Sequence, residues 1–84
     1  PPEAAEAPGR QMAEAQVRAV LERALEQQAL VALCYDTGGV GAWSRRTVRP
    51  LALEPRAEGW YLRAYCCARQ AERTFRLDRI GAVE

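Results

Sequence analysis

The order of the hydrophobic patterns constrains this fold more than any other feature of the sequence. Between about Arg10 and Gln28, apolar residues recur at the spacing of one helix face, with Val17, Val20, Leu21 and Leu25 at i, i+3, i+4 and i+8. After this segment the apolar residues come only in short runs or in alternation, separated by polar or glycine-rich turns. The sequence therefore predicts a mainly β domain with one N-terminal helix.

Strand patterns fill the rest of the chain. We expect four strands, at about residues 29–35, 42–53, 60–67 and 73–77, and a fifth near residues 81–84. Pro50 cannot donate a ladder hydrogen bond, so it marks an edge or a bulge in the second strand. Consecutive short strands favour an antiparallel sheet that bends into a small β-barrel of four to five strands, because closure hides strand edges. The helix would cap one open end of this barrel with its Val20, Leu21 and Leu25 face.

At 84 residues the chain can hold one small domain. Residues 1–9 are only Pro, Ala, Glu and Gly, so we expect a disordered or extended linker there. The domain would cover residues 10–84, with the helix at about 10–28 and the barrel at about 29–84. The chain starts at Pro1, and we interpret it as a piece of a longer protein. It has no run of about 18 apolar residues and no signal-peptide pattern, so the expected location is cytoplasmic, without a membrane partner.

Charge is distributed unevenly along the chain. Residues 1–44 contain three arginines and six acidic residues, which gives −3, whereas residues 45–84 contain nine arginines and five acidic residues, which gives +4. All twelve basic residues are arginine, whose planar fork of donors pairs with phosphate and stacks on rings or bases. The second half of the chain is therefore the part suited to an anionic partner.

The residue types argue against an enzyme and against a metal or cofactor. The sequence has no His, which removes Ser-His and Cys-His dyads, and it has no Cys-x-x-Cys pair for a structural zinc ion. The glycines at 38, 39 and 41 lie between two strand patterns and indicate a hairpin turn, not a phosphate loop before a helix. The three cysteines are odd in number, which suits reduced thiols.

Strand alternation gives a first set of candidate ligand residues. On the third strand, Tyr61 and Arg63 fall on the face opposite the apolar residues, and Arg76 of the fourth strand falls on the same outer face. Neighbouring like charges are unfavourable unless an anion neutralises them, which argues for a ligand. The alternative is that nearby acidic residues pair with these arginines and leave only a solvated surface.

A second set of basic residues lies on neighbouring segments. Arg73 and Arg79 flank two apolar residues of the fourth strand and would emerge at either end of the barrel. The second strand carries a cluster of polar and basic residues, Ser44, Arg45, Arg46 and Arg49. If the second and third strands pair, we expect the two sets to merge into one surface.

Four separated motifs resemble one known family. Trp60-Tyr61-Leu62 follows a glycine, and the run from Arg73 to Ile80 (RTFRLDRI) comes about ten residues later. Upstream, Tyr35 ends an apolar strand and residues 44–53 read SRRTVRPLAL. Over residues 16–84 the chain resembles the WYL domain, the sensor module of many bacterial transcription regulators. This resemblance implies a Sm-like, SH3-type barrel with an N-terminal helix, and it matches Arg46 and Ser44 to the family's ligand patch.

The resemblance further implies a nucleic-acid or nucleotide-like effector, with short single-stranded DNA as the favoured class. The predicted ligand site comprises Ser44, Arg46, Tyr61, Arg63, Arg73, Arg76 and Arg79, holding phosphates while aromatic or Arg planes stack on bases. The partners expected are this anionic ligand, other domains of the same regulator, such as a helix-turn-helix domain, and a second copy of the chain. The alternative function is a protein-interaction or dimerisation module with no small ligand, because SH3-type barrels serve many purposes.

Overall fold

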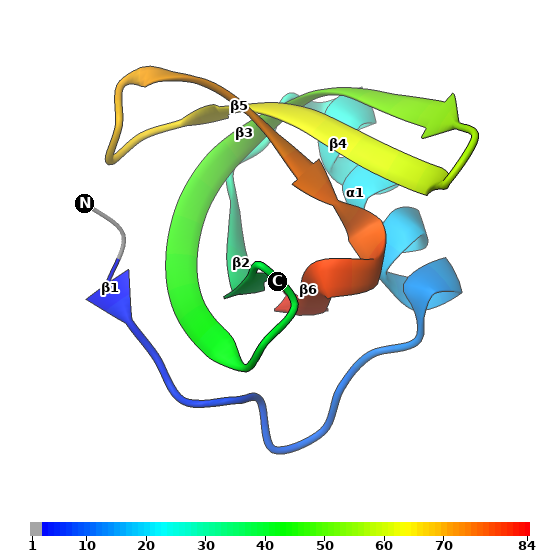
Figure 1. The fold of residues 1–84 in the computed structure, drawn as a ribbon. Coiled ribbons are helices and arrows are strands. Elements are labelled where there is room, and N and C mark those ends of the chain that lie inside the picture. Colours follow the sequence, from blue (N-terminus) through cyan, green and yellow to red (C-terminus); the bar gives the residue numbers. More distant parts are fainter. Residues whose placement is uncertain (1–2) are drawn as a thin grey trace.

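The computed structural model describes residues 3–84 and contains one helix followed by strands (Figure 1). The elements are β1 (Glu3–Ala4), α1 (Glu14–Gln27), β2 (Val31–Thr37), β3 (Ala42–Arg56), β4 (Gly59–Cys66), β5 (Ala71–Arg76), the 3-10 turn η1 (Leu77–Arg79) and β6 (Ile80–Val83). The mainly β class with one N-terminal helix is thus confirmed. Residues 1 and 2 of the expected linker lie outside the described residues.

The strands form one antiparallel sheet in the order β5-β4-β3-β2-β6, and the short β1 pairs beside β3. Figure 1 shows β3 as a long curved strand around which the sheet bends. The register of β3 against β4 shifts between Pro50 and Ala52, which confirms the irregularity expected at the proline. The first half of β3 pairs with β2, and the second half of β3 pairs with β4.

The sheet is not closed into a barrel, which corrects the expectation from the sequence. Within residues 3–84 the two ends of the strand order, β5 and β6, do not pair with each other. The chain leaves β5 at Arg76 and turns through η1 before β6 begins at Ile80. Three residues in a 3-10 turn cannot continue a strand ladder, so the sheet stays curved but open at this point.

The concave side of the sheet holds the core against α1. The helix buries Val17, Leu21 and Ala24, while Val20 and Leu25 of the expected face lie half-exposed. The helix packs against β3, β6 and η1. The sheet contributes the fully buried side chains of Leu33, Val48, Leu62 and Phe75 to the same cluster, and η1 contributes Leu77. Within the described part of the chain, no helix has the length and apolar character needed to cross a membrane.

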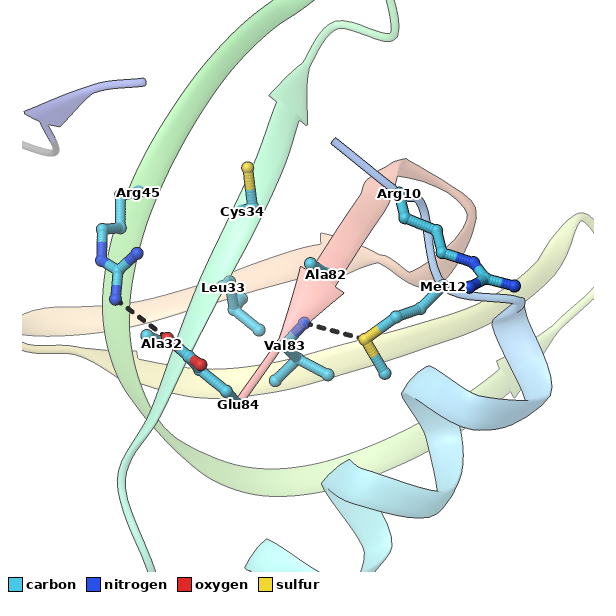
Figure 2. Close-up of a pocket in the computed structure, with 9 residues that line it drawn as sticks. All are labelled: Arg10, Met12, Ala32, Leu33, Cys34, Arg45, Ala82, Val83 and Glu84. Carbon is cyan, nitrogen blue, oxygen red and sulfur yellow. Dashed lines mark hydrogen bonds and ion pairs between the residues drawn. The ribbon is translucent and has the colours of Figure 1, made fainter. Parts of the chain in front are cut away.

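The residues before the helix form a strap across the convex side of the sheet. We call residues 3–12 the N-terminal strap. Its backbone meets β3 where Ala5 N–H donates to the Trp43 carbonyl (3.2 Å), and it meets β6 where Met12 N–H donates to the Gly81 carbonyl (2.8 Å). Figure 2 shows the second contact of Met12, whose sulfur accepts from Val83 N–H at 3.4 Å.

Between these two anchors the strap passes over the outward side chains of β2 and β6. A cavity of about 260 Å³ lies between it and strands β2, β3 and β6, lined by Arg10, Met12 and Cys34 among others (Figure 2). The Cys34 thiol donates to the Glu6 carbonyl at 3.7 Å. Ala13 is extended (φ −65°, ψ 149°) and caps the helix, so α1 begins at Glu14 and not near Arg10 as the sequence pattern suggested.

Candidate ligand-binding site

Arg46 is the most unusual residue of the structure, because it is a charged side chain on the core face of the sheet. It lies on β3 between Ser44 and Val48, which both face inward, and only 6% of it is exposed. No ion pair joins Arg46 to an acidic side chain within residues 4–84. Buried arginines are normally paired, so an unpaired one is a candidate for contact with a ligand.

Two hydroxyl groups and two rings hold the guanidinium of Arg46. Its Nε donates to Ser44 Oγ (3.2 Å) and its Nη2 to Thr37 Oγ1 (3.4 Å). Its Cζ lies 5.8 Å from the ring centroid of Tyr35 and 5.6 Å from that of Phe75, within the range of cation–π attraction. The buried Nη1 has no hydrogen-bond partner within the described part of the chain.

The two rings are themselves fixed in place. Tyr35 and Phe75 meet edge to face, with centroids 5.0 Å apart and an interplanar angle of 81°. The Tyr35 hydroxyl accepts from the backbone N–H of Arg76 at 3.1 Å, which ties β2 to the end of β5. The guanidinium therefore rests against a rigid aromatic wall contributed by two strands.

Two further arginines, Arg69 and Arg73, place positive charge near Arg46. Burial lowers the pKa of Arg46 below its ordinary value, and the charges of Arg73 and Arg69 lower it further. Arg73 pairs across from buried Ala64 and lies two residues before Phe75, so it is on the inner face with Arg46. Like Arg46, neither Arg69 nor Arg73 forms an ion pair with an acidic side chain of residues 4–84.

Arg79 lies at the rim of this region. It belongs to η1, and its Nε is 3.2 Å from the position that a Cβ on Gly39 would occupy. Its guanidinium therefore rests on the β2–β3 turn, two residues beyond Thr37. We call Ser44, Arg46, Arg69, Arg73 and Thr37, with Arg79 at the edge, the inner basic site.

The other predicted site residues lie on the outer face of the sheet and are neutralised. Arg63 pairs with Glu54 (3.4 Å) and Glu72 (3.1 Å), and Arg76 forms a bidentate pair with Asp78 (2.7 and 3.0 Å). The hydrogen bond to Glu72 raises the pKa of Arg63, and the hydrogen bond to Asp78 raises the pKa of Arg76.

Tyr61 belongs to the same outer surface. Its ring lies 4.2 Å from the guanidinium carbon of Arg56, and a hydrogen bond to Glu58 raises the pKa of the tyrosine above its ordinary value. Tyr61 and Arg76 are direct cross-strand partners, as expected from the alternation. The outer face is therefore a network of opposite charges.

The structure thus brings Ser44, Arg46 and Arg73 together and separates them from Tyr61, Arg63 and Arg76. The expected single surface does not form, for two reasons. Ser44 and Arg46 point toward the core, and they precede Val48, the first residue of β3 that pairs with β4. Thr37, Arg69 and Phe75 were not among the predicted site residues. Period-two spacing from Tyr35 places Thr37 on the same face, and this signal could have identified it.

The comparisons with known proteins agree with this architecture. The family model described as WYL domain matches residues 16–84. The chain is also similar to the solved structure of proteasome accessory factor B/C (PafBC) of Arthrobacter aurescens, with 32% sequence identity and a TM-score of 0.80 over 90% of the chain. The chain spans 12% of the length of that structure. No curated protein matches the sequence significantly.

Proposed function

Because this chain belongs to the WYL domain family, we propose that it is the ligand-sensing regulatory domain of a bacterial transcription regulator. Its ligand would be a nucleic-acid or nucleotide-type anion, with short single-stranded DNA as the favoured class. Other domains of the same regulator, such as a helix-turn-helix domain, and a second copy of the chain are its proposed partners.

The observation that carries this proposal is the unpaired, buried guanidinium of Arg46. A buried charge without a partner is costly unless something compensates it, and nearby Arg69 and Arg73 add to the cost. An anion that enters the inner basic site would relieve this repulsion. The arginines of the outer face offer no comparable gain, because carboxylates already neutralise Arg63 and Arg76.

Ligand binding would regulate by shifting a balance between two arrangements of domains or subunits. Such a shift requires that the ligand bind one arrangement more tightly than the other. β3 suits this role, because its segment from Trp43 to Arg46 faces the inner basic site on one side and pairs with the N-terminal strap along its edge.

A fluorescence-anisotropy titration of the 84-residue chain with short labelled single-stranded oligonucleotides tests the proposal. We expect Arg46→Met and Arg73→Gln to weaken binding by about tenfold or more, since each removes a charge-assisted hydrogen bond. Arg63→Gln and Arg76→Gln are the matched controls, because they remove the same charge from the outer face. We expect these two variants to bind within about threefold of the wild type.

The outcomes separate the candidate functions. An equal loss in all four variants would indicate general attraction to a basic protein and would contradict a specific inner site. No binding by the wild type would favour the protein-interaction or dimerisation module instead.

A further inference from the structure

We infer that the inner basic site receives a terminal phosphate, the monoester at the end of a strand or on a nucleotide, and not an internal phosphodiester. This inference rests on the proposed function and narrows its ligand. It follows from three features of the site: its free donors, its net charge and its restricted access.

The free donors around Arg46 suit a ligand that offers several acceptors. Nη1 carries hydrogens that no group of the described chain accepts. The hydroxyls of Ser44 and Thr37 already accept from Arg46, at 3.2 and 3.4 Å, so each still has its own hydrogen to donate. A group with several acceptor oxygens and no donor, such as a fully ionised phosphate, complements this set.

The charge of the site favours a dianion. The charges of Arg69 and Arg73 both act on Arg46, and no acidic side chain of residues 4–84 pairs with any of the three. A phosphate monoester carries about −1.5 to −2 at pH 7, because its second pKa is about 6. An internal phosphodiester carries a single negative charge and one fewer free oxygen.

Access to the site favours an end group. Only 6% of Arg46 is exposed, and the rings of Tyr35 and Phe75 cover one side of its guanidinium. The hydrogen bond to exposed Thr37 shows that the guanidinium extends toward the surface beside the β2–β3 turn. An internal phosphodiester bears a nucleoside on both sides and needs an open groove, whereas a terminal phosphate approaches a guanidinium from one side only.

A competition experiment tests the inference. One labelled oligonucleotide is displaced by unlabelled oligonucleotides of identical sequence that carry a 5′-phosphate, a 3′-phosphate or hydroxyls at both ends. We expect one of the end-phosphorylated strands to compete about tenfold or more better than the hydroxyl strand, since it gains charge-assisted hydrogen bonds. This preference should disappear in Arg46→Met, shrink in Thr37→Val and persist in the outer-face control Arg76→Gln.

The pH adds an independent readout. Below about pH 6 the phosphate monoester gains a proton, so the advantage of the phosphorylated strand should fall between pH 7 and pH 5. Competition by inorganic phosphate and by a nucleoside monophosphate distinguishes a strand end from a free nucleotide as the source of the group.

The results that would overturn the inference differ from those that would overturn the proposed function. Equal competition by all three strands, with binding still dependent on Arg46, would reject the terminal phosphate and leave nucleic-acid binding in place. Binding of a nucleoside monophosphate without any oligonucleotide binding would support the terminal phosphate and reject single-stranded DNA. No binding of any of these anions would reject both.

Discussion

At the scale of single residues, Arg46 departs from the rule that charged side chains lie outside or in pairs. Its position on the core face costs stability, because burial and two neighbouring arginines disfavour its charge. Two weak cation–π contacts and two long hydrogen bonds offset part of that cost. Sequences violate folding rules mainly where function requires it, which is why this residue is a stronger guide to the ligand site than the more numerous exposed arginines.

Replacing Arg46 by an apolar side chain of similar length should therefore not destabilise the fold. We expect Arg46→Met to leave the free energy of unfolding unchanged or to raise it by up to about 2 kcal/mol, since it removes an unsatisfied buried donor. Urea denaturation measures this change. Arg63→Met is the control on the outer face, where the loss of exposed ion pairs should lower stability by about 0 to 1 kcal/mol. A loss of more than about 1 kcal/mol in Arg46→Met would contradict the view that Arg46 is kept for binding.

The carboxylates of the outer face lead to a prediction about pH. Hydrogen bonds from Arg56 and then Arg63 lower the pKa of Glu54 below its ordinary value of 4.5. The folded state therefore binds fewer protons than the unfolded state, and this contribution to stability is present above pH 4.5 and is lost as the pH falls toward the folded-state pKa. Carbon-detected NMR titration of Glu54 should show the lowered pKa, and Arg56→Gln should bring it back toward 4.5. An unchanged titration in Arg56→Gln would show that this hydrogen bond does not form in solution.

At the scale of the elements, local patterns predicted most of the strands and the faces of β4 and β5. Leu62, Ala64 and Cys66 are fully buried while Tyr61 and Arg63 face outward, because period-two alternation suffices wherever apolar residues mark the core side. The inward direction of Ser44 and Arg46 is harder to predict, because polar residues lie on both faces of this part of β3. Arg45, Thr47 and Arg49 are exposed, so only the period-two spacing from buried Val48 places Ser44 and Arg46 on the core side.

The contacts that the N-terminal strap makes with β3 and β6 were not predicted, for a different reason. Its composition of Pro, Ala, Glu and Gly gives no local signal for structure, and its contacts are with residues more than 25 positions away, such as Cys34 and Gly81. The start of α1 and the open sheet depend in the same way on long-range partners. Only tertiary contacts fix such features, and one sequence does not display them.

Gly81 provides a test of the strap. A Cβ on Gly81 would lie 2.7 Å from the Trp43 ring and 2.8 Å from the Pro8 side chain, so Gly81→Ala must displace the ring, the strap or both. Displacement would expose Cys34, whose thiol now donates to the Glu6 carbonyl. In a Cys67→Ser background, where buried Cys66 is protected, we expect Gly81→Ala to raise the rate of Cys34 modification by a thiol reagent.

Gly9→Ala is the matched control for this measurement. It adds the same methyl group to the strap, where a Cβ meets no atom within 4 Å. Its rate of Cys34 modification should equal that of the parent. Equal rates in both variants would mean that the strap does not shield Cys34 in solution.

At the scale of the whole molecule, the fold determines which arginines of the basic half of the sequence are free to bind an anion. The excess of arginine in residues 45–84 predicted an anionic partner but did not indicate which arginines remain available. The fold separates them, since Arg45, Arg56, Arg63 and Arg76 each pair with a carboxylate. Arg46, Arg49, Arg69, Arg73 and Arg79 form no such pair within residues 4–84. Arg49 is exposed on the outer face of β3, away from the inner basic site, so the net charge overstates the number of arginines that can hold one anion.

The salt dependence of binding should report this smaller number of arginines. If Arg46, Arg69, Arg73 and Arg79 together neutralise about four negative charges of the bound strand, about two of them on a terminal phosphate, the single-strand slope of about −0.7 per charge predicts a roughly fifty-fold loss of affinity between 50 and 200 mM salt. Anisotropy titrations at four salt concentrations measure the slope. Arg73→Gln should reduce it by about 0.7, whereas Arg76→Gln should leave it unchanged because Asp78 already neutralises Arg76. A slope near zero, or one reduced equally by both substitutions, would show that the unpaired arginines do not define the binding surface.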